Sequence, residues 1–223
     1  MAELTPRLLG QRCSALRVLF VQEEIADRLL ELLRGAMEEL VIGDPMNLAT
    51  DVGPVIDGAA KIELQRHIEK LRLIASPVCE LRLPAGAEKG SFVAPCAFEI
   101  PRLDFLEHEV FGPILHVIRF QRAALDKVID AINDTRYDLT LGIASRIETT
   151  IRHIQSRARV GNIYVNRNMI GTVVGVQPFG GKGLSGTGPK AGGPNYLLRF
   201  ATERTVSVNT AAMGGNTALT ALD

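Results

Sequence analysis

The chain has 223 residues, 46% of them hydrophobic, which suits one globular domain or a lobe of a larger one. Its 25 basic residues balance 25 acidic ones, so the charge favours neither nucleic acid nor an anionic membrane as a partner. No stretch approaches the roughly 20 apolar residues that span a bilayer, and the start, "MAELTPRLLG", lacks the basic and apolar regions of an export signal.

The first predicted elements are a strand and a helix. Residues 15–21, "ALRVLFV", are apolar and partly β-branched, which predicts a buried strand. A helix should follow, because apolar residues then recur at the helical period until "GDP" at 43–45 ends it. The side chains expected on its inward face are Ile25, Leu29, Leu32, Leu33, Met37 and Leu40.

The middle of the chain predicts one more helix and three strands. The helix covers about residues 59–72. Its expected inward side chains are Leu64, Ile68 and Leu71. The expected strands lie at 79–84, 91–100 and 112–120.

The last third continues the alternation of helix and strand. Its expected helices cover 123–135, with Leu125, Val128 and Ile132 on one face, and 147–158. Its expected strands are 139–147, 160–166 and, after a glycine-rich segment, 202–209. Alternating strands and helices predict an α/β fold with a largely parallel, twisted sheet and flanking helices.

Cys13 is the first candidate for chemistry. It is one of three cysteines that lie far apart and form no CxxC pair, which favours a reducing cytoplasm. A buried thiol that acts as a small hydrophobe is one interpretation. The polar neighbours Gln11, Arg12 and Ser14 favour the other, a nucleophile whose thiolate a nearby guanidinium stabilises.

The second candidate is "EHEVFGPI" at 107–114, with Glu109 and Phe111 before a turn. A carboxylate can accept hydrogen bonds from both hydroxyls of a ribose, and a ring two residues later can pack on a flat heterocycle. A solvated glutamate and a core phenylalanine would give the same pattern, so the pattern alone leaves both interpretations open.

The third candidate is the loop "VQPFGGKGLSGTGPKAGGP" at 176–194. It satisfies GxGxxG, but it runs on through prolines instead of starting a helix, so a dinucleotide fingerprint is rejected. Lys182 is followed by glycine, which excludes a Walker A loop. We expect a structured loop close to a ligand, with Phe179 walling a pocket. Lys182 and Lys190 could bind an anion, but solvated lysines are the commoner case in a loop.

The four histidines show no HxH or HExxH spacing, so no metal site is expected.

Together, "GQRC", "EVFGP" and "PFGGKGLSG" resemble the nucleophile, cofactor-ribose and aldehyde-pocket motifs of the aldehyde dehydrogenase superfamily, in that family's order. The chain is more closely similar to the L-glutamate γ-semialdehyde dehydrogenase domain of the bifunctional proline utilisation A enzymes. "GQRCSALRVL", "GTVVGVQPFGGKGLSGTGPKAGGP" and "VNTAAMGGN" carry this narrower likeness. The resemblance covers Gly10 to about Asn216.

The resemblance implies the catalytic roles. Cys13 would form a thiohemiacetal with the aldehyde, its oxyanion held by the Cys13 N–H and a family asparagine. Hydride would pass to NAD, and water would release the acid. Glu109 would bind the nicotinamide ribose, and Phe111 would hold the nicotinamide ring.

The resemblance also implies the substrate contacts. Ser14 and the backbone of Gly171 and Thr172 would bind the substrate carboxylate, and Phe179 would line its aliphatic stem. Thr172 stands where a smaller residue is usual, and Asp138 replaces a common glycine without expected consequence for the site.

The likeness begins abruptly at Gly10, after a leader that does not match. Members of the family carry a long preceding region with the NAD-binding domain, the oxyanion asparagine and the glutamate that activates water. We therefore expect a leader over 1–9, a catalytic lobe over 10–200 and an oligomerisation strand and arm over 201–223. The expected partners are the aldehyde, further copies of the chain and the missing region.

The expected activity is oxidation of glutamate semialdehyde by a fragment that is inactive alone. Two alternatives remain open: a dehydrogenase for another small aldehyde, and a fragment without catalysis that serves assembly.

Overall fold

A four-stranded sheet occupies the first half of the protein in a computed structural model that describes residues 10–170, 172–173, 175–209 and 212. Its strands are β1 (Val18–Gln22), β2 (Ser76–Glu80), β3 (Cys96–Glu99) and β4 (Ile114–Phe120), in the order β1-β4-β3-β2. β4 pairs parallel with both neighbours, and β2 pairs antiparallel with β3. The predicted α/β class with a largely parallel sheet is thus confirmed.

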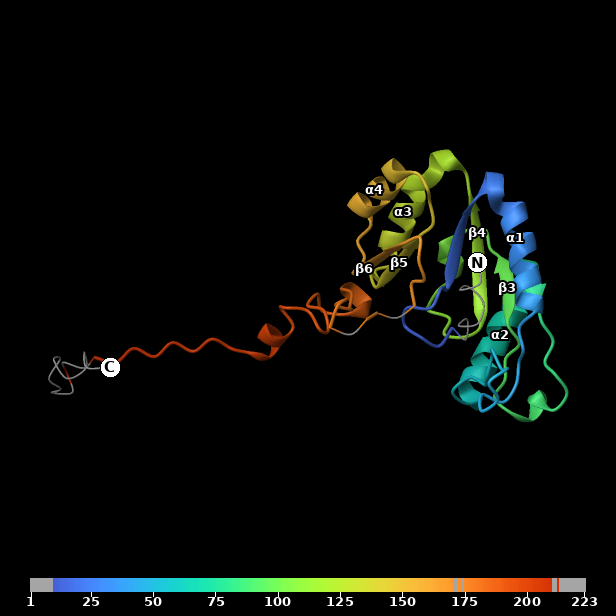
Figure 1. The fold of residues 1–223 in the computed structure, drawn as a ribbon, viewed down its shortest axis with the longest axis horizontal. Coiled ribbons are helices and arrows are strands. Elements are labelled where there is room, and N and C mark those ends of the chain that lie inside the picture. The colour runs from blue at the N-terminus through green and yellow to red at the C-terminus, as the bar shows by residue number, and fades with distance from the viewer. Residues whose placement is uncertain (1–9, 171, 174, 210–211, 213–223) are drawn as a thin grey trace.

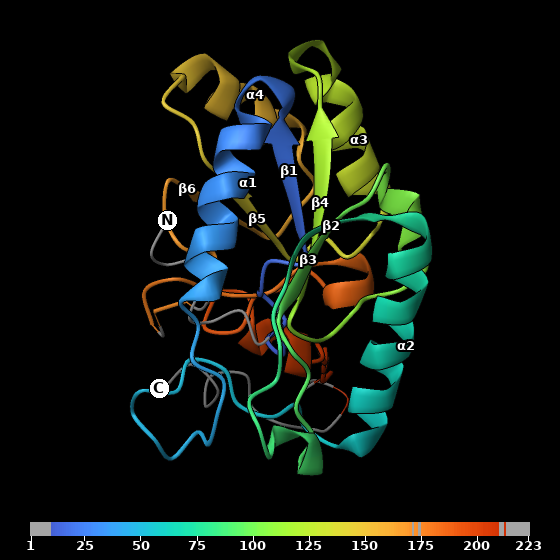
Figure 2. The same ribbon diagram turned by 90° about the vertical axis from the view of Figure 1, so that its right-hand side faces the viewer.

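Helices α1 (Glu23–Glu38) and α2 (Gly58–Ile74) pack on opposite faces of this sheet (Figure 1, Figure 2). Leu115 and Val117 of β4 join the core on the α1 side, and Ile114 and Ile118 join the core on the α2 side. Because β4 is covered on both sides, its sequence is an almost continuous apolar run. α2 begins where the Asp57 carboxylate accepts a 2.8 Å hydrogen bond from the Ala60 N–H.

The second half forms a smaller layered unit beside β1 and β4 (Figure 1). It contains α3 (Leu125–Asp134), β5 (Thr140–Ile143), α4 (Glu148–Arg157) and β6 (Asn162–Val165). β5 and β6 form a separate parallel pair. Short 3-10 helices lie at Ala87–Lys89, Leu103–Phe105, Arg122–Ala124, Gly183–Ser185 and Leu197–Phe200.

Several predicted details are wrong. The buried stripe of α1 is Ala26, Leu30, Leu33 and Met37, whereas Ile25 and Leu32 are exposed. The buried stripe contains a small residue, Ala26, that packs against the sheet. The prediction was wrong because it placed the larger apolar side chains beside this alanine on the inward face.

Strand boundaries also differ. β2 begins at Ser76 instead of 79 and carries Pro77 on the sheet's edge, where a missing N–H is tolerated. Residues 202–209, predicted as a strand, are exposed and have no regular structure. They run away from the body (Figure 1), and a strand needs a neighbour to supply its hydrogen bonds. The arm expected over 201–223 is therefore not seen as a paired strand, and most of 210–223 lies outside the described residues.

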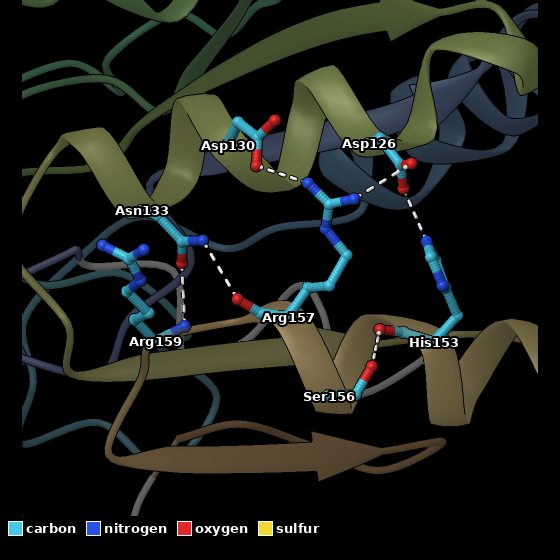
Figure 3. A network of polar contacts seen from close by, with 7 residues as sticks. All are labelled: Asp126, Asp130, Asn133, His153, Ser156, Arg157 and Arg159. Atoms are coloured by element: carbon cyan, nitrogen blue, oxygen red, sulfur yellow. Dashed lines mark hydrogen bonds and ion pairs between the residues drawn. The ribbon is translucent and has the colours of Figure 1, made fainter.

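α3 and α4 are joined by a polar network on their surface (Figure 3). The Arg157 guanidinium binds Asp126 at 3.1 Å and Asp130 at 2.8 Å, and the His153 Nε2 contacts the Asp126 carboxylate at 2.5 Å. Asn133 accepts a hydrogen bond from the Arg159 N–H and donates one to the Arg157 carbonyl. These contacts fix the register of the two helices above β5 and β6.

The connector Arg136–Tyr137–Asp138 leads from α3 to β5. Arg136 (φ 60°) and Asp138 (φ 48°) both adopt the left-handed backbone region that favours glycine. The Asp138 Oδ1 is also buried and finds no hydrogen-bond partner among the described residues. This explains why glycine suits position 138.

A histidine pair ties α2 to the sheet. His116 is fully buried on β4, and its Nδ1 lies 3.0 Å from the Arg17 carbonyl, so Nδ1 carries the proton that is donated. The His116 Nε2 then accepts from the His67 Nε2 at 2.9 Å. Burial lowers the pKa of His116 to about 4, with the nearby charges of His67 and Arg17 acting in the same direction.

Among the described residues, no helix is long and apolar enough to cross a membrane.

We predict that the protein loses stability between pH 6.5 and pH 4. An unfolded histidine takes up its proton near pH 6.5, but the folded His116 does so only near pH 4. The unfolded state thus binds more protons in this window, and the loss reaches about 3 kcal/mol. Urea unfolding across the window measures it. His116→Asn keeps a donor and an acceptor without the titration, so its stability should fall less steeply; equal slopes would contradict the assignment.

We predict that Asp138→Gly stabilises the protein by about 1 kcal/mol. Glycine adopts the left-handed backbone conformation without strain, and it removes a buried oxygen that has no partner among the described residues. These two gains in stability outweigh the greater conformational entropy that glycine has in the unfolded chain. Urea unfolding is the measurement. Arg136→Gly is the matched control, since it shares the backbone conformation but has an exposed side chain and should gain less. A less stable Asp138→Gly variant would show that the strain is absent.

Candidate active site

The Cys13 loop lies just before β1, at the end of the sheet where β1 and β4 both begin. Cys13 is exposed, and the next residue, Ser14, is only 3% exposed. The Ala15 N–H donates to the Arg12 carbonyl at 3.0 Å, so the loop is a tight turn. The structure therefore presents the thiol to solvent and turns the following hydroxyl inward.

The loop rests directly on the turn that follows Phe111. Gly10 has φ 60°, and a Cβ at this position would lie 1.6 Å from the Gly112 carbonyl oxygen. Gly112 is in turn packed on the core side chain of Leu64. The glycine of "GQRC" is thus required for the two motifs to touch, and the glycine of "FGP" leaves room for the Leu64 side chain.

Arg17 joins the two motifs through its side chain. Its guanidinium donates two hydrogen bonds to the Glu109 Oε1, from Nε at 3.2 Å and from Nη2 at 3.0 Å. It also donates to the carbonyls of Gly10 and Arg12, the latter at 2.8 Å. Burial lowers the pKa of Arg17, and the Glu109 carboxylate acts in the opposite direction, as does the charge of Cys13.

Phe111 completes the cluster. The Arg17 guanidinium carbon lies 4.3 Å from the centre of its ring, which is a cation–π contact. The ring remains 40% exposed. Glu109, Phe111 and the backbone of the Cys13 loop therefore all contact one arginine.

The glycine-rich loop is closed by backbone pairing. Phe179 and Ala191 exchange N–H to carbonyl hydrogen bonds of 3.1 and 2.9 Å. Within it, Gly183–Ser185 forms only a 3-10 turn, so the helix of a dinucleotide fingerprint is not found in this described segment. Lys190 was expected to be solvated, and that is wrong: its Nζ donates to the carbonyls of Gly161 and Gly180 and to the Asn162 side chain. Burial lowers the pKa of Lys190.

The connector 136–138 links this loop to the cofactor motif. The Leu184 N–H donates to the Arg136 carbonyl at 2.9 Å, and a Cβ on Gly181 would lie 2.4 Å from the Asp138 carbonyl oxygen. On the other side, the Glu109 N–H donates to the Tyr137 hydroxyl at 3.1 Å. Position 138 was expected to have no consequence for the site, yet its backbone lies between two of the three motifs.

The predicted site residues fall into two groups. Cys13, Glu109 and Phe111 are brought together around Arg17. Phe179 and Thr172 are half-buried in the glycine-rich region, and no described hydrogen bond joins them to the Cys13 loop. Gly171 lies outside the described residues.

Three residues that hold these segments in place were not predicted to do so: Arg17 in the cluster, Tyr137 beside Glu109, and Lys190 in the glycine-rich loop. A charged residue inside the apolar run "ALRVLFV" was the available signal for Arg17, because a buried arginine needs acceptors for its donors. Tyr137 and Lys190 contact residues that are distant in sequence, so no local sequence pattern predicted their contacts.

The cluster can accommodate part of a nicotinamide cofactor. Both Arg17 contacts go to Oε1 of Glu109, so Oε2 has no partner among the described residues and can accept from ribose hydroxyls. The exposed part of the Phe111 ring offers an apolar surface to a flat ring.

Comparisons with known proteins show the family of the chain. Residues 6–206 match the family described as "Aldehyde dehydrogenase family". The chain is 53% identical over 200 residues to "Bifunctional protein PutA" of Klebsiella aerogenes, which covers 87% of the chain and 15% of that protein.

Two solved structures show the same fold. A mutant of Bradyrhizobium japonicum proline utilization A (PutA) superposes with a TM-score of 0.85 at 59% identity, over 93% of this chain and 21% of that one. A 1-pyrroline-5-carboxylate dehydrogenase from Thermus with bound NAD gives a TM-score of 0.77 at 35% identity, over 86% and 37%. The chain thus spans a minor part of these relatives. By its match over residues 6–206, it belongs to the aldehyde dehydrogenase family.

Proposed function

We propose that this chain provides the nucleophile and part of the cofactor site of an NAD-dependent dehydrogenase that oxidises L-glutamate γ-semialdehyde to glutamate. The observation that carries the proposal is the cluster of exposed Cys13, Glu109 and Phe111 around Arg17, in a chain of the aldehyde dehydrogenase family. The names of the similar proteins support the substrate, since 1-pyrroline-5-carboxylate is the cyclic form of this aldehyde.

In this proposal the Cys13 thiolate attacks the aldehyde carbon. A carbon–sulfur bond forms, the carbonyl π bond breaks, and the oxygen becomes an oxyanion that the Cys13 N–H can bind. Bound NAD supplies the acceptor for the hydride that this carbon then loses. Water attacks the resulting thioester, the carbon–sulfur bond breaks, and the acid leaves while Cys13 recovers its thiolate.

The other groups of the chain orient the reactants. Glu109 binds the ribose through Oε2, and Phe111 supports the nicotinamide ring. Ser14, Gly171 and Thr172 are proposed to bind the substrate carboxylate, and Phe179 to line its aliphatic part. Ser14 is buried. In this proposal the substrate carboxylate must therefore reach the Ser14 hydroxyl on the inner side of the Cys13 turn.

We also propose that copies of the chain associate through residues 201–223, in the cytoplasm. Val206 and Val208 are exposed, which suits a strand that pairs with a partner. A chain that serves assembly alone would dimerise without a reactive Cys13.

We predict that one equivalent of iodoacetamide at neutral pH modifies Cys13 alone. Cys79 and Cys96 are buried, and burial raises the pKa of Cys96 to about 12 and also raises that of Cys79. Peptide mapping by mass spectrometry identifies the site.

The matched control is Thr149→Cys in a Cys13→Ser background, which places an exposed thiol on α4 away from Arg17. In the proposal Cys13 is the attacking nucleophile of the site, so it should react several-fold faster than this thiol on a helix surface. Equal reaction rates for the two thiols would contradict the proposal that Cys13 is the nucleophile.

We predict that the 223 residues alone show no steady turnover. The proposed contacts reach only the nicotinamide end of NAD, and the relatives that act on 1-pyrroline-5-carboxylate or proline are far longer. The measurement is NADH absorbance with glutamate semialdehyde and NAD. NADH formation that is linear in time and in chain concentration would contradict this.

A further inference from the structure

Arg17 occupies an unusual position for a charged residue. It directly precedes β1, within an apolar run, and its side chain is only 14% exposed. Its own backbone is fixed, because its carbonyl accepts from both the N–H and the Nδ1 of His116 at 3.0 Å. The guanidinium is therefore held at a defined place in the sheet.

The first consequence concerns the peptide bond between Arg12 and Cys13. The Arg12 carbonyl accepts from the Arg17 Nη2 and from the Ala15 N–H, so it points into the turn. In a trans peptide the C=O and the N–H point in opposite directions. The Cys13 N–H is thus directed away from Arg17, and it has no acceptor among the described residues.

The second consequence concerns Glu109. Both hydrogen bonds from Arg17 go to Oε1, which leaves Oε2 without a partner among the described residues. A planar guanidinium fixes a carboxylate in this way, whereas an ammonium acts as a point charge without a preferred plane. The same planar group lies over Phe111.

We propose that Arg17 is a positioning residue that aligns the oxyanion-binding N–H of Cys13 with the ribose-binding oxygen of Glu109. This inference rests on the proposed function for the roles of Cys13 and Glu109. Beyond that function, we infer that one guanidinium couples the two motifs. Its planar geometry, in addition to its charge, sets the positions of both groups.

The test uses the full chain with Arg17→Lys, which keeps the charge but loses the planar fork. The matched control is Arg34→Lys, which alters an arginine that donates to the Val78 carbonyl at 2.9 Å away from the site. The first readout is the equilibrium constant for adduct formation between Cys13 and carbon-13-labelled succinic semialdehyde, followed by NMR. Arg17→Lys should lower it by about tenfold, as expected for a misaligned donor to an oxyanion, and Arg34→Lys should not.

The second readout is the backbone amide signal of Cys13, compared in the native background and in Arg17→Gln. Glu109→Gln alters a partly exposed side chain and should shift the backbone amide signal of Cys13 in the native background, but not in Arg17→Gln. A purely structural role for Arg17 would not produce this dependence, and urea unfolding shows whether each variant is folded.

The outcomes separate the two proposals. If adduct forms equally in the native chain and in Arg17→Lys, or if Glu109→Gln leaves the Cys13 signal unchanged, positioning by Arg17 is overturned while the proposed function stands. If the native chain forms no adduct, the proposed function fails at its nucleophile, and the amide coupling alone then decides the role of Arg17.

Discussion

The parallel pairing of β1 with β4 is the constraint on which the site depends. Val18 lies opposite His116, so the segments that precede these two strands meet at the same end of the sheet, although about a hundred residues separate them in sequence. This pairing is stabilised by burial of apolar side chains on both faces of β4, against α1 on one side and α2 on the other. The cluster around Arg17 is a direct result of that register.

A buried guanidinium is stable here because its donors are matched. Removing an arginine from water without partners carries a large penalty, and the Gly10 and Arg12 carbonyls together with Glu109 offset it. Gly10 lets the Cys13 loop lie directly on the Gly112 backbone, and Gly112 lets this turn pack against the Leu64 side chain. Motif glycines and the arginine are therefore parts of one arrangement, and neither would be useful without the other.

Much of this architecture could be predicted from the sequence. In the part of the chain that the structure describes, apolar periodicity located all four α-helices and the six strands of the two sheets, with errors of a few residues at strand ends. It failed for the α1 face, where small Ala26 lies inward and Ile25 outward, and for 202–209, where β-branched residues have no neighbour to pair with. Cys13, Glu109 and Phe111 carried recognisable motifs. Arg17 did not, because its role arises from contacts that only the folded sheet creates.

The connector 136–138 extends the same coupling to the glycine-rich loop. Tyr137 holds the Glu109 backbone, and the carbonyls of Arg136 and Asp138 contact the loop, whose other end Lys190 anchors to the start of β6. The network between α3 and α4 supports this unit from the outside (Figure 3). A shift of the Glu109 turn would therefore be transmitted to the loop that carries Phe179. The turn of Glu109 and the loop of Phe179 thus both contact the connector 136–138, in which Arg136 and Asp138 adopt the left-handed backbone conformation that glycine would adopt without strain.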